Sequence, residues 1–244
     1  MILKTEGIVL RTMRYQEHNL ITTLYTREHG IRSFLISGFR SARSKGKHSY
    51  FQPLSIIDII FFYRENRDLH KITESKVSHL LLEAQTDPVK LSLGLAIIEI
   101  FFDTVKEEEQ NEEMYEFLRQ VIVMLDVSEK RLIQLFIYFL LHLTRFLGFF
   151  PNDESDGMDR VKFLPREGVF LPDQAANDEV AQMLRKFIYS TLDPLPAEES
   201  CQHIIFSSQT KKNIIKTLFE YYRLHIEGFK YPQTMKVFAE LFGD

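Results

Sequence analysis

The chain has 244 residues, 45% of them apolar, and its 34 Asp and Glu residues against 30 Lys and Arg residues give a net charge of −4. This length and apolar content exclude a disordered chain and predict a buried core divided between two domains. The single cysteine, Cys201, excludes an internal disulfide, and residues 1–7 lack the pattern of a signal peptide, so a cytoplasmic location is expected.

The charge is distributed unequally along the chain. Residues 1–83 contain thirteen Lys and Arg residues against eight Asp and Glu residues, a balance of +5, whereas the other 161 residues have a balance of −9. The acidic total argues against a nucleic-acid partner, but the basic excess is confined to the N-terminal part. A nucleic-acid partner is therefore considered for that part of the chain.

Short segments rich in β-branched and aromatic residues occupy the first 76 residues, with turn-like breaks between them. A hairpin connection is expected at Gly30, which can adopt a positive φ. In the third segment, a period of two places Arg32, Phe34 and Ile36 on one face. The predicted strands are 8–15, 20–26, 31–37, 55–63 and 69–73. Five short strands with one long loop predict a small barrel of the oligonucleotide-binding (OB) type.

From about residue 75 the apolar spacing becomes helical, which predicts an all-α domain over residues 77–244. Asp87 and Pro88 are typical of a helix start. The expected helices are 88–106, 113–126, 128–148, 178–192, 208–227 and 233–242. The candidate N-caps are Ser128, Asn177 and Ser208, and the candidate stops are Gly148 and Gly228. The most apolar stretch, 132–150, is interrupted by polar residues, so we interpret it as a buried helix and not as a membrane span.

Residues 151–173 interrupt the helical pattern, because they are rich in Asp, Gly and Pro, with a small hairpin expected at 163–171. The predicted fold class is therefore α+β with two domains. A five-stranded OB barrel at residues 1–76 precedes a helical domain that carries a small irregular insertion.

A basic loop after Gly38 is the sharpest functional signal in the sequence. Four cations fall within eight residues beside aromatic side chains, so groups that bind phosphates lie next to surfaces on which bases stack. The candidate DNA-binding residues are Arg11, Arg14, Arg32, Phe34, Phe39, Arg40, Arg43, Lys45, Lys47 and Phe51. The alternative is a solvated loop whose charges have no partner.

A second basic patch is expected on one stripe of the helix at 208–227. Lys212, Lys216 and Arg223 recur at spacings of four and seven residues. These cations are consistent with an ordinary solvent-exposed helix face. The alternative is that they bind an acidic peptide tail or additional DNA.

Catalytic and metal-binding motifs are missing from the sequence. No phosphate loop, G-x-G-x-x-G, G-x-S-x-G or H-E-x-x-H occurs, and a single cysteine does not provide a structural zinc site. We therefore expect no catalysis, no metal and no cofactor. The alternative is an unrecognised hydrolase that uses His70, Cys201 or His203.

The order of residues in the N-terminal part closely resembles the RecO family of bacterial DNA repair and recombination mediators. The matching segments are GIVLRT at 7–12, YQEHNLI at 15–21, YTREHG at 25–30, SGFR at 37–40 and FQPL at 51–54. FLGFFP at 146–151 is similar to a further element of that family.

The resemblance implies an N-terminal OB barrel, a helical C-terminal domain, binding of single- and double-stranded DNA, and strand annealing. It also implies two protein partners, RecR and the acidic C-terminal tail of single-strand binding protein, with action on the nucleoid. Many members carry two Cys-x-x-Cys pairs in the insertion, but here Asp156-Gly157-Met158-Asp159 stands near the first position. The insertion is therefore expected to be a degenerate, zinc-free version of that element.

A protein-interaction adaptor remains the competing function. In that reading the barrel is a platform for other proteins, and the basic loop has no role in DNA binding.

Overall fold

The computed structural model describes residues 1–38, 49–65, 67–106, 109–175, 178–191 and 207–234. Its described residues form two compact units. The first is Met1–Val127 together with Thr234, and the second is Ser128–Gln233. The first unit thus contains the N-terminal strands and two helices, and the second contains the insertion and the later helices.

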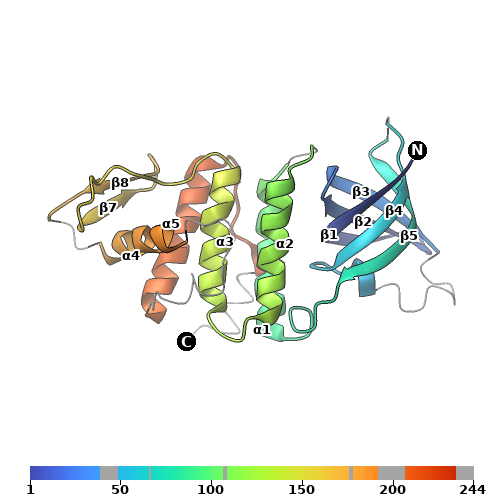
Figure 1. Cartoon of the computed structure of the whole chain (residues 1–244), viewed down its shortest axis with the longest axis horizontal. Helices are drawn as coiled ribbons and strands as arrows, with labels where there is room; N and C mark the ends of the chain where they lie inside the picture. The colour runs from blue at the N-terminus through green and yellow to red at the C-terminus, as the bar shows by residue number, and fades with distance from the viewer. Residues whose placement is uncertain (39–48, 66, 107–108, 176–177, 192–206, 235–244) are drawn as a thin grey trace. The chain divides into compact units, whose positions relative to one another are not determined.

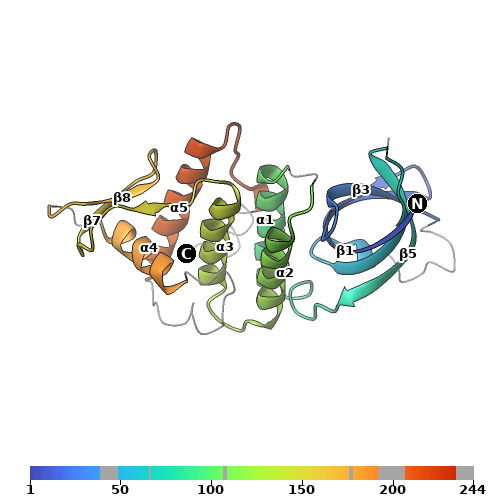
Figure 2. The ribbon, with the colours of Figure 1, turned by 45° about the horizontal axis from the view of Figure 1, so that its top comes forward.

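Five strands form a closed barrel in the first unit. They are β1 (Ile2–Tyr15), β2 (Asn19–Thr26), β3 (Gly30–Ser37), β4 (Ile56–Phe62) and β5 (Leu69–His79). Their order around the barrel is β1-β2-β3-β5-β4, with β3 and β5 parallel and all other neighbours antiparallel. Figure 2 shows these strands curving around the interior. The predicted five-stranded OB-like barrel is confirmed.

The first and last strands are longer than the sequence pattern indicated. β1 begins at Ile2 and pairs with β4 over its first half and with β2 over its second half. β5 continues to His79, past residue 76. Charged residues at the outward positions, such as Glu6 and Lys76, obscured the apolar alternation in both extensions. The division of the chain at residue 76 stays a prediction.

Alternate residues of each strand fill the barrel interior. Phe34 is fully buried, and its ring lies edge-on to the Phe61 ring at 5.1 Å between centroids. Ile36 packs against the same core, which confirms the predicted face of β3. Gly30 has a φ of 62°, as the hairpin turn requires.

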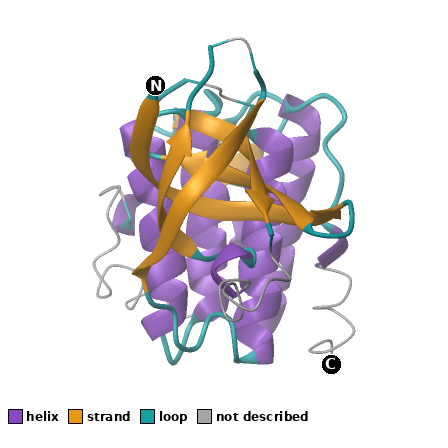
Figure 3. Cartoon of the chain, turned by 90° about the vertical axis from the view of Figure 1, so that its right-hand side faces the viewer, coloured by secondary structure: helices purple, strands orange, loops and turns teal. Residues whose placement is uncertain are grey.

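Two helices, α1 (Pro88–Thr104) and α2 (Glu112–Val127), pack against one side of the barrel (Figure 1). The strands on the opposite side face the viewer in Figure 3. The Asp87 carboxylate accepts hydrogen bonds from the N–H groups of Val89 and Lys90 at 2.9 Å, so the predicted start of α1 is confirmed.

Aromatic packing joins the barrel to these helices. The Tyr25 ring of β2 lies 4.9 Å from the Phe101 ring and 5.7 Å from the Tyr115 ring. Gly94 of α1 permits close approach, because a Cβ atom there would lie 2.6 Å from Leu54 Cδ1. The helices therefore cover the end of β2 that is near Tyr25.

A charged cluster around Glu6 lies at the same contact. Its carboxylate is 3.1 Å from Arg27 Nη2 and 3.3 Å from Arg119 Nε, and the Tyr115 hydroxyl donates to it at 3.1 Å. Burial favours a raised pKa for Glu6, but hydrogen bonds from Ser78, Arg27 and Tyr115 outweigh it and lower the pKa. Glu6 is therefore ionised in the folded protein at neutral pH.

The second unit combines three helices with a small sheet. Its elements are α3 (Leu132–Phe146), β6 (Asn152–Asp153), β7 (Val161–Leu164), β8 (Val169–Pro172), α4 (Glu179–Ser190) and α5 (Ser208–His225). The sheet order is β6-β8-β7, so the predicted hairpin in the insertion is confirmed. The Tyr222 hydroxyl of α5 donates to the Leu140 carbonyl of α3 at 2.7 Å.

Three helix starts differ from the prediction. α3 begins at Leu132 after Arg131, whose φ of 65° ends the preceding segment, so Ser128 is not its cap. The cap of α5 is Ser207 and not Ser208, because Ser207 Oγ accepts the Thr210 N–H at 3.0 Å. Asn177 lies outside the described residues, and the cap of α4 is Asp178.

The two glycines predicted to end helices agree with the structure. Gly148 and Gly228 follow α3 and α5 with φ values of 82° and 76°, which favour glycine. Most of the helix expected at 233–242 lies outside the described residues. In the part of the chain that the structure describes, no helix is long and apolar enough to cross a membrane.

We predict that Glu6→Gln lowers the free energy of unfolding at pH 7 by about 1–3 kcal/mol, because Arg27, Arg119 and Tyr115 lose a charged partner. Urea unfolding followed by circular dichroism measures the change. Glu74→Gln, an exposed carboxylate on β5, is the matched control and is expected to have little effect.

The same pair of proteins tests the pH dependence. The folded-state pKa of Glu6 lies below its ordinary value of 4.5, so its contribution is complete above that pH and is lost as pH falls through the folded pKa. The difference between wild type and Glu6→Gln should therefore shrink below about pH 4.5. A difference that grows with acidification would contradict the assignment.

Candidate nucleic-acid interface

Part of the outer surface of the barrel is covered by neither α1 nor α2. Cross-strand pairing builds it from two rows, with Arg11, Thr23, Ser33 and Leu69 in one and Met13, Ile21, Leu35 and Lys71 in the other. Thr23 Oγ1 lies 3.4 Å from Ser33 Oγ, so side chains of one row point the same way. We term these eight residues, with Tyr15, the outer face. None of them is buried.

A β-bulge in β1 positions Arg11 on this face. Val9 pairs with Leu24 and both are fully buried, whereas Arg11 pairs with Thr23 and is exposed. The register shifts between Val9 and Arg11, so two residues that simple alternation places on one face lie on opposite faces. Sequence periodicity alone does not reveal this change.

The three predicted strand arginines do not form one row. Arg14 pairs with Leu20, and Arg32 pairs with Leu24, and both of these leucines point into the barrel. Arg11 instead pairs with Thr23, which points outward. Leu20 and Leu24 are four residues apart on β2, about 13 Å along the strand. The strand register therefore separates these three candidate residues, and their roles in DNA binding stay predictions.

Two predicted aromatic residues are part of the core. Phe34 is fully buried and Phe51 is 3% exposed, so neither ring is accessible for base stacking. The Phe51 carbonyl also accepts a hydrogen bond from Thr12 Oγ1 at 2.7 Å, which fixes this segment on β1. The assignment of Phe34 and Phe51 as stacking residues is thus corrected.

The predicted basic loop lies outside the described residues, and with it Phe39, Arg40, Arg43, Lys45 and Lys47. Its two flanking residues are described. The Gly38 N–H donates to the His18 carbonyl at 2.9 Å, and the 3-10 turn Ser49–Phe51 follows the loop. Ser37 pairs with Asn19, and Asn19 pairs with Tyr15, so the loop begins beside the outer face. The role of its cations stays a prediction.

Of the nine residues of the outer face, sequence reasoning identified only Arg11, and Tyr15 and Lys71 are the two missed residues with the clearest binding chemistry. Tyr15 is 43% exposed at the end of β1, and Lys71 is exposed beside Leu35. Neither belongs to a local cluster of like residues, so only the strand register identifies them. Arg64 and Arg67 are further exposed cations, in the turn between β4 and β5. In OB barrels this turn and the outer surface of β2 and β3 are typical ligand-binding elements.

Arg32 is near two histidines at one end of the barrel. Burial is the main cause that lowers the pKa of both His29 and His70, and the Arg32 charge lowers it further. His70 is 3% exposed, and its ring stacks on the Tyr63 ring at 5.2 Å. The hydrolase alternative relied on His70 with Cys201 and His203, and the last two lie outside the described residues.

The second predicted patch is exposed on α5. Lys212, Lys216 and Arg223 are all exposed, but Glu220 follows Lys216 by one helical turn. The stripe is therefore interrupted by an acidic residue. Its role in binding stays a prediction.

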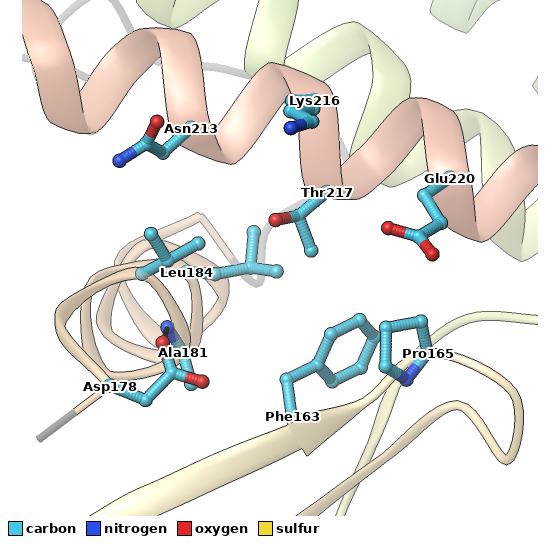
Figure 4. A pocket seen from close by; sticks show the side chains of 10 residues that line it. Phe163, Pro165, Asp178, Ala181, Leu184, Asn213, Lys216, Thr217 and Glu220 are labelled. Atoms are coloured by element: carbon cyan, nitrogen blue, oxygen red, sulfur yellow. Dashed lines mark hydrogen bonds between the residues drawn. The ribbon is translucent and has the colours of Figure 1, made fainter. Parts of the chain in front are cut away.

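Lys216 also borders a pocket of about 390 Å³ between β7, α4 and α5 (Figure 4). Phe163, Ala181 and Leu184 give it an apolar wall, and polar side chains surround the opening. The charged residues of the lining are Lys216, Asp178 and Glu220. The Asp178 carboxylate is already engaged, since it accepts the Ala181 N–H at 2.9 Å.

In the insertion, Asp153 is the centre of a polar cluster with Arg185 and Tyr189. Its carboxylate accepts hydrogen bonds from Arg185 Nε at 2.6 Å and from the Tyr189 hydroxyl at 2.5 Å. Burial favours a raised pKa for Asp153, but hydrogen bonds from Ser155, Tyr189 and Arg185 hold it well below its usual range. Among the residues that the structure describes, no group of three or more His, Cys, Asp or Glu side chains is arranged to hold a metal ion.

Comparison with protein families gives two adjoining matches. Residues 1–81 match the family described as Recombination protein O N terminal, and residues 85–234 match Recombination protein O C terminal. The first match covers the barrel. The second covers all five α-helices of the described residues.

Several proteins that are similar to the chain over their whole length are named DNA repair protein RecO. The chain is 32% identical over 254 residues to the DNA repair protein RecO of Phocaeicola vulgatus, with all of both chains covered. It is 30% identical over 249 residues to DNA repair protein RecO of Christiangramia forsetii, again over all of both chains. The RecO protein of Flavobacterium psychrophilum is 29% identical over 244 residues. The chain therefore belongs to the RecO family of bacterial DNA repair proteins.

Proposed function

We propose that this protein is a non-catalytic mediator of DNA repair and recombination that binds single- and double-stranded DNA through its barrel. The observation that carries the proposal is the outer face, where Arg11 and Lys71 are exposed among apolar side chains and no Asp or Glu is present. The basic loop begins beside this surface and supplies four further cations.

Binding through phosphates follows from this chemistry. Each cation that neutralises a phosphate releases counterions, so affinity decreases steeply with salt. Contacts with phosphates carry no base information, so sequence preference is expected to be small. The acidic balance of residues 84–244 favours the barrel over the second unit as the main DNA surface.

The remaining steps of the proposed function rest on family membership. They are annealing of complementary strands and, with a RecR-like partner, recombinase loading onto strands covered by single-strand binding protein. The proposed location is the nucleoid in the cytoplasm.

An adaptor function is the second candidate, in which the outer face binds protein and the basic loop has no ligand. Exposed apolar side chains on this face are compatible with it. The two candidates differ in whether the loop cations matter for DNA.

We propose further that the pocket bordered by Lys216 receives the acidic tail of single-strand binding protein. Its apolar wall suits the apolar side chains of a short peptide, and Lys216 is positioned to attract a carboxylate. Glu220 and Asp178 weaken that attraction, so the affinity should depend strongly on the one lysine.

We predict that reversing the four loop cations, with Arg40→Glu, Arg43→Glu, Lys45→Glu and Lys47→Glu, strongly weakens DNA binding. Fluorescence anisotropy with a labelled single strand at several salt concentrations measures it. If all four contact phosphates, the slope of log affinity against log salt falls by about 3, at roughly 0.7 per contact.

The matched control reverses four exposed lysines elsewhere, Lys106, Lys130, Lys186 and Lys230, and so changes the net charge equally. It should retain most of the wild-type slope. Equal loss in both variants, or no loss in the loop variant, would favour the adaptor.

For the pocket, we predict that Lys216→Met weakens binding of a labelled acidic tail peptide by about threefold to tenfold, because one charged contact is lost. Thr217→Phe should weaken it as well by filling the pocket. Lys186→Met, an exposed lysine on α4 outside the pocket lining, is the control. Wild-type affinity in both pocket variants would place the tail elsewhere.

A further inference from the structure

The pairing of β3 with β5 is the shortest in the barrel. Within the described residues these strands run parallel and pair at three positions only, which are Ser33–Leu69, Phe34–His70 and Leu35–Lys71. β2 and β3, in contrast, pair over the full length of both strands. Parallel pairing is also slightly less stable per residue than antiparallel pairing. We term these three pairs the seam, and we expect local opening of the barrel to begin there.

A buried imidazole lies at the middle of the seam. His70 is 3% exposed, and its ring stacks on the Tyr63 ring at 5.2 Å and lies near the rings of Phe34 and Phe61. Its Nδ1 has no hydrogen-bond partner among the residues that the structure describes. A proton added to this ring would create a charge among aromatic side chains, which is costly without a partner. The closed seam therefore accommodates His70 as a neutral ring.

The charged groups that face His70 do not compensate for a proton. Burial is the main cause that lowers the pKa of His70, and Arg32 of β3 and His29 of the β2–β3 turn lower it further. Asp68, just before β5, and a hydrogen bond with the Phe62 backbone act in the opposite direction without outweighing these causes. The neighbour that follows β4, Tyr63, contributes an aromatic ring. Protonation thus adds a positive charge beside an existing one.

The seam also crosses the outer face. Ser33 and Leu35 belong to the β3 side of the seam, and Leu69 and Lys71 belong to the β5 side. Separation of the two strands would therefore divide the surface that is proposed to bind DNA into two parts.

We propose that protonation of His70 opens the β3–β5 seam, so that the charge of this one ring controls whether the barrel is closed. The inference goes beyond DNA binding, and only its consequence for the outer face rests on the proposed function. When the strands separate, the ring reaches water and takes up a proton at its ordinary pKa of 6.5. The stability of the closed seam is therefore complete above about pH 6.5 and decreases as pH falls towards the lower pKa of the closed state.

Hydrogen exchange of backbone amides, measured by NMR on the full chain from about pH 7.5 to about pH 5, tests the inference. Protection factors are used, because they correct for the pH dependence of the intrinsic exchange rate. Protection of the seam amides should fall by up to about tenfold for each pH unit below about 6.5, because opening takes up one proton. Amides paired between β1 and β2 should keep their protection over this range, which lies above the pH at which Glu6 is protonated.

Two substitutions remove the titrating ring, His70→Phe and His70→Gln, and both should abolish the pH dependence of seam protection. His18→Gln, at an exposed histidine between β1 and β2, is the matched control and should behave as wild type. His29→Gln should keep most of the pH dependence, because His70 remains. Circular dichroism verifies that each variant folds.

Seam protection that does not change with pH in wild type would overturn the inference. So would a pH dependence that persists in a folded His70 variant or disappears in His29→Gln. An equal loss of protection throughout the barrel would also overturn it, since that result indicates global unfolding. A labelled oligothymidine titrated at about pH 7.5 separates the two proposals, because failure to bind it would overturn the proposed function and leave the seam result standing.

Discussion

The arrangement of the barrel surface depends on the pairing of β1 with two neighbouring strands, β4 and β2. Its first half pairs with β4 and its second half with β2, and the bulge between Val9 and Arg11 lies within the part that pairs with β2, just after the last residue that pairs with β4. The extra residue keeps Val9 in the core while turning Arg11 outward. Without it, the second half of β1 would present its other side chains to solvent, because a shift of one residue exchanges the two faces of a strand.

The barrel has a side that α1 and α2 cover and a side that they leave open, and β2 contributes residues to both. Towards its C-terminal end, β2 presents Tyr25 to α1 and α2, and the charged cluster around Glu6 lies at this contact. Towards its N-terminal end, β2 presents Ile21 to solvent. The acids of the first unit that pair with Arg27 and Arg119 are thus at the covered side, whereas Arg11 and Lys71 are exposed on the open side.

The sequence predicted the barrel, the hairpin of the insertion and the start of α1, because Gly30, Asp87 and alternating apolar residues are local signals. It did not predict the bulge, so Arg11, Arg14 and Arg32 were grouped although the register separates them. Phe34 and Phe51 are candidate DNA-binding residues in the sequence but core residues in the structure, since composition does not distinguish a core ring from an exposed one. Tyr15 and Lys71 come together only through pairing between distant strands.

The central claim is that the outer face of β1, β2, β3 and β5 holds single-stranded DNA. Methyl NMR of protein labelled at Met, Ile, Leu and Val, titrated with a short oligothymidine, tests it most directly. The account predicts chemical-shift changes at Met13, Ile21, Leu35 and Leu69, with Leu80, Leu82 and Val127 unaffected. Changes confined to the second group, or to the second unit, would contradict it.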